Sequence, residues 1–366
     1  MNNKTNFDEL IKYSVFNTYP DYAIDEILDI LEEKKMIKTK KRISNKNTDV
    51  KEDGVVDVSA IIKSKDKLNY FLEYNKEFDL SAFILNYEWD KGFRHAVLLE
   101  IEGFNVNTLN KCIEKGNIID VKFEKSSNVS EYISNPILNK NGEGYVLKFP
   151  LVKKGIINDD KIINIKYPVI VVIDSINNLI EIRFDKIKTI FQQTKKNFYE
   201  DLIKGIVGWL KSFLELNTKQ VELKPQIQKI IDEYNENMEE AEVIPMKRDV
   251  ALKSGSKVVL DIDANKNFIV PILGDLKFIM KSYEDELKNI PLLKQELEKL
   301  IKTVEEGDVP KLSLYWRRVG IMVGITHGYK ESEYSLFHYY GEIKDSRMMD
   351  YVRKYFKNNR AKDSGK

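Results

Sequence analysis

The pattern of apolar and polar residues divides the chain into three regions. Before residue 54, apolar residues recur at helical spacing, most clearly over 23–31, which indicates amphipathic helices. From residue 55 to 187 much of the pattern has the period of strands, and beyond residue 188 it is helical again. We therefore predict an α+β protein with three domains: a small helical piece with a basic linker (1–54), a mostly antiparallel sheet domain (55–187) and a helical domain (188–366).

The N-terminal piece combines helices with a cluster of positive charge. A helix that runs into residues 36–43 is consistent with the last helix and first wing strand of a winged helix. Between residues 34 and 48 there are seven basic residues and no acidic one. This run is either a solvated linker or an arm that contacts phosphates, with Lys40, Lys41 and Arg42 at its centre.

Two hairpins are expected in the central region. The first joins strands 80–89 and 93–102 through Asp90-Lys91-Gly92, and the second joins strands 163–173 and 179–187. In the second hairpin Glu181, Arg183 and Asp185 alternate with apolar residues, which is typical of a strand with one solvated face. The other predicted elements here are strands 118–124 and 144–152 and helices 65–74 and 105–115.

The C-terminal region contains a heptad pattern. Apolar residues recur every seven positions from Leu276 to Val304, and most of the intermediate positions are also apolar. Such spacing indicates a helix that packs lengthwise on another helix, and Pro291 divides it in two. The partner is either the apolar helix expected over 190–216, or a second copy or another protein, with residues 276–304 as the contact.

Composition excludes several kinds of chemistry. The chain has three histidines and one cysteine, too few for Cys/His zinc sites or Cys-x-x-Cys redox pairs. It has no Walker A motif, dinucleotide fingerprint or Gly-x-Ser-x-Gly elbow. A single cysteine suits a reducing cytoplasm, and we expect no signal peptide and no membrane span.

One enzymatic interpretation remains, a metal-dependent nuclease. Such a site needs carboxylates on neighbouring strands to hold Mg²⁺ and a lysine beside the attacking water. Glu102 on one predicted strand and Asp120 with Lys122 on the next have this form. Asp174 with Glu181 and Arg183 is a second candidate, in which arginine replaces the lysine. Outside this alternative we expect no cofactor.

Basic and aromatic residues favour nucleic-acid binding over cleavage. Arg317, Arg318, Tyr339 and Tyr340 combine cations for phosphates with rings for base stacking. The C-terminal helix adds Arg353, Lys354, Lys357 and Arg360. The net charge is only +1, so any such surface must be a local patch.

These observations favour a cytoplasmic, non-catalytic component that binds nucleic acid, with DNA as the expected polymer, and acts with a partner protein. The nuclease and a purely protein-binding scaffold remain alternatives. The high content of Lys, Ile and Asn is typical of AT-rich microbial genomes, where chains of this kind are often mobile-element or anti-phage components.

Overall fold

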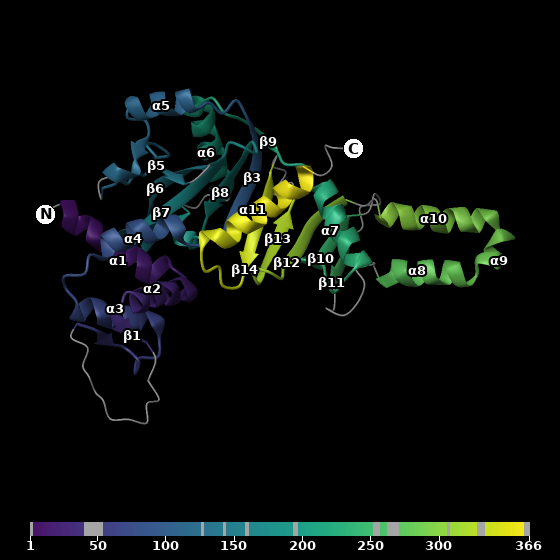
Figure 1. The fold of residues 1–366 in the computed structure, drawn as a ribbon, viewed down its shortest axis with the longest axis horizontal. Helices are drawn as coiled ribbons and strands as arrows, with labels where there is room; N and C mark the ends of the chain where they lie inside the picture. The colour runs from purple at the N-terminus through teal and green to yellow at the C-terminus, as the bar shows by residue number, and fades with distance from the viewer. Residues whose placement is uncertain are drawn as a thin grey trace.

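The computed structural model describes residues 3–39, 54–125, 128–141, 144–157, 161–192, 197–251, 257–261, 271–305, 308–327 and 334–361. It confirms the α+β class, because helices surround one large, mostly antiparallel sheet (Figure 1). No helix in these ranges has the length and apolar character that a membrane crossing requires.

The N-terminal lobe consists of α1 (Asn3–Thr18), α2 (Asp21–Glu33), α3 (Ser64–Tyr74) and α4 (Leu80–Asp90). Their buried side chains form one cluster that runs from Phe7 to Tyr87, so this core crosses the boundary expected at residue 54. Two short strands, β1 (Ile37–Lys38) and β2 (Val56–Asp57), pair in parallel. The strands of a winged-helix hairpin would run antiparallel. Lys40, Lys41 and Arg42 lie outside the described residues.

The first predicted hairpin is wrong, because residues 80–90 form helix α4. The Asp79 side chain accepts a hydrogen bond from the Ala82 N–H at 2.8 Å, which caps the helix. The buried residues of α4 include Ser81, Ile84 and Tyr87, which are three apart and share one helical face. Apolar residues on every side of this segment hid that period from the sequence pattern.

The central sheet holds 12 strands among the described residues, in the order β11-β10-β12-β13-β14-β3-β8-β7-β6-β5-β4, with β9 also paired to β3. Their bounds are β3 (His95–Glu102), β4 (Ile119–Asp120), β5 (Ile137–Asn141), β6 (Gly144–Ile157), β7 (Lys161–Asp174), β8 (Leu179–Phe184), β9 (Asn217–Gln220), β10 (Val243–Ala251), β11 (Lys257–Asp261), β12 (Asp308–Trp316), β13 (Ile321–Thr326) and β14 (Ser335–Tyr340). The pairing of β14 with β3 joins the C-terminal strands to the central ones. One sheet therefore crosses the boundary expected at residue 187.

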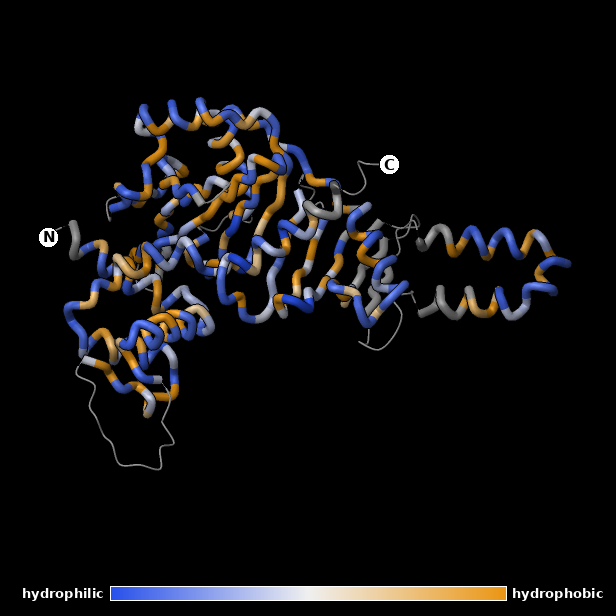
Figure 2. Tube along the Cα trace, in the orientation of Figure 1, coloured by the Kyte–Doolittle hydropathy of each residue, from blue (hydrophilic) through white to orange (hydrophobic). Residues whose placement is uncertain are grey.

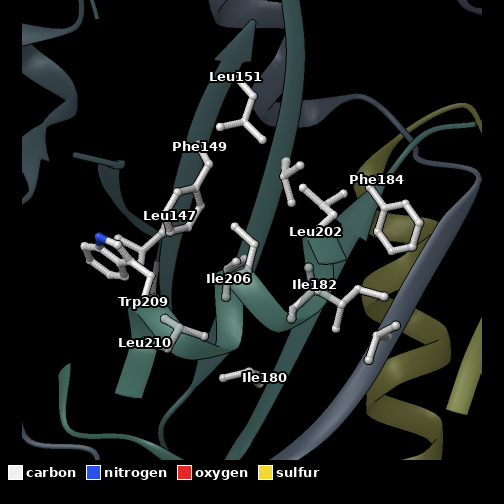
Figure 3. Packing of buried hydrophobic residues seen from close by; sticks show 14 of the residues in the cluster. Leu147, Phe149, Leu151, Ile180, Ile182, Phe184, Leu202, Ile206, Trp209 and Leu210 are labelled. Atoms are coloured by element: carbon white, nitrogen blue, oxygen red, sulfur yellow. The ribbon is translucent and has the colours of Figure 1, made fainter. Parts of the chain in front are cut away.

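Helices cover the sheet on both faces, and Figure 2 shows the hydrophobic residues concentrated along the strands. On one face α6 (Phe198–Leu214) packs Leu202, Ile206 and Trp209 against β6, β7 and β8 (Figure 3), beside α5 (Val106–Glu114). On the other face α7 (Lys224–Glu236) and α11 (Ser346–Ala361) cover β10, β12, β13 and β14. We call the latter the α11 face and the former the α6 face.

The second predicted hairpin forms, as β7 and β8 pair antiparallel. Its expected solvated face is wrong, because every residue of β8 is buried. Glu181 and Arg183 point to the α11 face and are each 2% exposed. The sequence pattern of a solvated strand therefore arises here from charges that pair beneath a helix.

The heptad segment forms an arm of α8 (Pro271–Ser282), α9 (Glu284–Lys288) and α10 (Pro291–Glu305), inserted between β11 and β12. The arm extends away from the sheet, far from α6 (Figure 1). The core cluster that holds α6 contains no arm residue. The helical hairpin expected between these two segments is therefore not formed by the described residues.

Candidate functional site

A histidine pair lies where β14 meets β3. The register sets His338 opposite His95, and His338 Nδ1 lies 2.9 Å from His95 Nε2. One imidazole therefore donates a hydrogen bond to the other. The His95 ring also stacks on Phe184 at 5.5 Å and near Tyr199 at 6.2 Å. The rings of Phe184 and Tyr199 belong to the edge of the core on the α6 face.

Both histidines are poor bases in this setting. Burial, followed by the nearby His338, lowers the pKa of His95 to about 4. Burial also lowers the pKa of His338, with further lowering by Arg94, Lys186 and Lys311. Both imidazoles are therefore neutral at pH 7; Arg94 and Lys186 lower the pKa of both rings, and Asp185 acts on the pKa of His95 in the opposite direction.

Beyond the pair, one face of β12, β13 and β14 is covered much less than the other. Leu314, Trp316 and Val323 are buried on the α11 face. The alternate side chains Tyr315 and Met322 are only half-buried and belong to neither core cluster of the sheet. We call this surface the open face; it carries Lys311, Ser313, Tyr315, Met322, Gly324, Thr326, Leu336, His338 and Tyr340.

The register arranges the open face in rows. Tyr315, Met322 and Tyr340 lie side by side in one row, and Ser313, Gly324 and His338 lie in the next. The two tyrosines are therefore about 10 Å apart across the strands. They place two aromatic rings on one surface.

A glycine explains the position of the Tyr340 ring. A Cβ added to Gly324 would lie 3.0 Å from the ring of Tyr340, so the ring leans across the strand over the glycine. The His338 ring meets it edge to face at 4.3 Å. An aromatic ring that covers a strand glycine in this way is a recognised packing device, and here it also holds the ring on the open face.

Cations surround this surface. Lys186 and Lys311 are exposed and close enough to His338 to lower its pKa. Arg94 is fixed, because its guanidinium lies over the Tyr22 ring at 4.2 Å and donates to the Gly341 carbonyl oxygen at 2.5 Å. The open face thus combines aromatic rings with at least three positive charges.

On the α11 face the charged side chains form a network of ion pairs with one another. Arg183 contacts Glu181 and Asp350 at 2.6 Å each, and Arg353 contacts Asp174 at 2.7 Å. Burial raises the pKa of Asp350, but Arg183 and Arg353 outweigh it and hold that pKa below its ordinary value. Each member therefore neutralises another, which is the behaviour of a structural network.

A second buried network attaches the N-terminal lobe to the sheet. Lys148 contacts Glu124 at 2.6 Å and Glu88 at 3.5 Å, and Lys166 contacts Glu88. Burial lowers the pKa of Lys166 to about 8, against the opposing effect of Glu88. Ser14 of α1 adds a hydrogen bond from the Lys166 N–H at 2.8 Å. The two lysines balance the two glutamates, so this buried network carries no net charge.

The arginines predicted to contact phosphate bind other parts of the chain. Arg317 donates to the carbonyl oxygens of Glu239 and Met238, the latter at 2.9 Å. The Arg318 guanidinium lies over the Tyr351 ring, 5.4 Å from its centre. Both side chains therefore hold segments near α7 and α11 together.

The other predicted contacts are divided between the two faces. Tyr339 is 1% exposed and Arg353 is 7% exposed, both on the α11 face, whereas Tyr340 lies on the open face. Lys354 is exposed on α11. The side chains of Lys357 and Arg360 lie outside the described residues. Among the described side chains, Arg317, Arg318 and Arg353 thus bind other parts of the chain and are not cations of the open face.

The predicted nuclease residues are not neighbours. Four strands separate β3, which ends at Glu102, from β4, which ends at Asp120, a distance of about 24 Å across a sheet. Glu102 pairs with Lys219 at 2.9 Å, and Asp120 accepts a hydrogen bond from the Lys122 N–H at the start of a 3₁₀ turn. The expected adjacency is therefore wrong. The described residues contain no group of three or more His, Cys, Asp or Glu side chains that could hold a metal ion.

Comparison with known proteins adds no relationship. No model of a protein family matches the chain, and no curated protein matches its sequence significantly. The site must therefore be interpreted from its own geometry.

The sequence pattern found only part of this site. Tyr340 is among the aromatic residues that the sequence singled out, whereas His338 and His95 meet only through the pairing of β14 with β3. Lys311 and Lys186 gave no signal, because isolated lysines are common in a chain that is 32% charged. Their approach to His338 depends on the register of three strands.

Proposed function

We propose that the protein binds single-stranded nucleic acid on the open face. The observation that carries this proposal is the row of Tyr315, Met322 and Tyr340 beside the cations Lys311 and Lys186. Proteins that hold single strands combine a positive track for phosphates with aromatic rings on which bases stack. Sheets whose exposed rings stack bases are a common way to achieve this.

A single strand fits this surface better than a duplex. The half-buried rings of the open face can contact only bases that are unstacked from their neighbours, and a duplex presents its phosphates instead. The cations lie to the side of the rings, near His338, where a backbone would run. DNA remains the expected polymer, and RNA is the comparison in the experiment.

The proposed activity is binding of nucleic acid without cleavage. Glu102 lies on the central strand β3 and Asp120 on the edge strand β4, and each of these carboxylates is bonded to another group. Stacking and phosphate contact need no such constellation. The protein would then act as the binding component of a larger system.

Fluorescence anisotropy of labelled oligonucleotides tests the proposal. We expect the full chain to bind single-stranded DNA or RNA more tightly than a duplex of the same sequence, and to lose affinity steeply between about 50 and about 200 mM salt. Equal affinity for the duplex would mean that the protein contacts only phosphates, and would overturn the proposal that the rings of the open face stack on bases. No binding at either salt concentration would overturn the function.

A further inference from the structure

The two exposed lysines beside the open face lie at opposite ends of a line across the strands. The strands β12, β13, β14, β3 and β8 are neighbours in this order (Figure 1). Lys311 is on β12, in the row that includes Leu336. Lys186 lies two residues beyond Phe184, the last residue of β8, which pairs with His95. The two lysines are therefore on the first and the last of five neighbouring strands.

His338 occupies the middle of this line. It lies on β14, two strands from β12 and two from β8. Lys311 is in the row on one side of His338, and Lys186 lies beyond the row of His338 on the other side, because it follows Phe184. Besides burial and Arg94, both lysines lower the pKa of His338, so both charges approach this imidazole.

Half-buried aromatic rings flank this line on one side. Tyr315 and Tyr340 are in the row beyond His338, away from the row of Lys311. On the opposite side of the line, Leu336 packs against the core of the α6 face, and Val97, its neighbour on β3, is buried. A strand whose phosphates follow the lysines can therefore stack its bases only on the side of the tyrosines.

The distance between the lysines sets the length of nucleic acid that this surface holds. Four spacings between neighbouring strands give about 19 Å, and four residues along the strands give about 13 Å. If residues 185 and 186 continue the line of β8, the Cα atoms of Lys311 and Lys186 lie about 23 Å apart. A stacked strand rises about 3.4 Å per nucleotide, so about seven nucleotides span this distance, and an extended strand needs fewer.

We propose that a single strand of nucleic acid crosses the open face diagonally, with its phosphates on a line from Lys311 past His338 to Lys186. Its bases turn towards Tyr315 and Tyr340, and the surface holds about four to seven nucleotides. This path rests on the proposed function. It adds the direction of the backbone across the strands, the length of the site and the contact of Lys186 with one end of the bound segment.

Oligothymidylates of increasing length test the path by competition against a labelled single strand. We expect their affinity for the full chain to rise steeply up to about four to seven nucleotides and to gain little beyond that length. Lys186→Glu should leave a trinucleotide almost unaffected, because a trinucleotide can bind beside Lys311 and the tyrosines. The same variant should weaken an octanucleotide about tenfold at about 50 mM salt. Lys111→Glu, on the exposed side of α5, makes the same charge change and should have little effect on either.

The possible outcomes distinguish the path from the proposed function. No binding of any oligonucleotide by the wild type would overturn the function, and the path with it. If the wild type binds but Lys186→Glu weakens the trinucleotide and the octanucleotide equally, or weakens neither, the path is wrong and the function stands. An affinity that keeps rising steeply well beyond about seven nucleotides would also overturn the path. Lys186 is exposed, so a circular dichroism melt should show unchanged folding of the variant.

Discussion

His338 and His95 come from strands 243 residues apart in sequence, and their Nδ1 and Nε2 atoms lie 2.9 Å apart. The rings of Phe184 and Tyr199 close one side of the pair, and positive charge lies around it. Burial, followed by the neighbouring His338, disfavours the charged form of His95 and lowers its pKa. The relationship makes the stability of the protein depend on pH.

The pH dependence has a definite sign. The pKa of His95 falls from 6.5 to about 4 on folding, so between these values the unfolded chain binds more protons than the folded one. The free energy of unfolding therefore decreases as the pH falls below about 6.5, by up to about 1.4 kcal/mol for each pH unit. Urea unfolding of wild type and His95→Gln at several pH values measures the difference.

Measurements of wild type and His95→Gln above pH 7 provide the control, because His95 is neutral there in both the folded and the unfolded chain. There the two proteins should differ only by a constant, and the gap should close as the pH falls towards 4. Glu26 acts in the opposite direction, because burial raises its pKa to about 7, but it is present in both proteins and cancels. Parallel pH profiles for the two proteins would show that the histidine pair does not couple to folding.

Removal of the Tyr340 ring should weaken nucleic-acid binding. Stacking of one base is worth about 1–3 kcal/mol, so Tyr340→Ala should lower the affinity for a single strand about tenfold or more. Tyr132→Ala is the matched control, because Tyr132 is 78% exposed on a distant loop. Equal affinities for the two variants in an anisotropy titration would mean that the open face does not stack bases.

Reversal of the Lys311 charge should change the salt dependence. Lys311→Glu removes one phosphate contact, so the slope of log affinity against log salt should fall by about 1. Lys111→Glu, on the exposed side of α5, changes the charge by the same amount far from the open face. An unchanged slope in Lys311→Glu, or the same change in both variants, would contradict a local contact.

Loss of Arg353 should destabilise the fold instead of weakening binding alone. Arg353→Met leaves Asp174 and Glu181 with fewer cations under α11, and removal of one partner from a buried ion pair costs about 3–5 kcal/mol. The neighbouring Lys354→Met should change the free energy of unfolding by less than about 0.5 kcal/mol, because Lys354 is exposed. A stable Arg353→Met protein with weakened binding would return Arg353 to the predicted phosphate contacts.

The buried lysines should behave as a coupled group. Lys166→Met leaves two glutamates against the single cation Lys148, so we expect a loss of about 3 kcal/mol or more in the free energy of unfolding. The double variant Lys166→Met/Glu88→Gln retains the 2.6 Å pair of Lys148 with Glu124 and should recover part of that loss. A double-mutant cycle by urea unfolding measures the coupling, and additive losses would show that Lys166 and Glu88 act independently.

Local sequence patterns predicted many elements correctly. The helix over 105–115 forms as α5, and the strands on both sides of residues 174–178 form as β7 and β8. The pattern failed for α4, where apolar residues on every side concealed the helical period, and for β8, where paired charges resembled a solvated face.

The sequence by itself determined the α+β class, the exclusion of most cysteine and histidine chemistry, and the heptad spacing of the arm, because these depend on composition and on contacts within a few residues. Only the tertiary structure decided which strands are neighbours. That choice placed His338 on His95, set Tyr340 over Gly324, separated Glu102 from Asp120 and buried Arg353 beneath α11. Each of these relationships depends on strand order and register, which are set by the burial of whole faces, so no local pattern contains them.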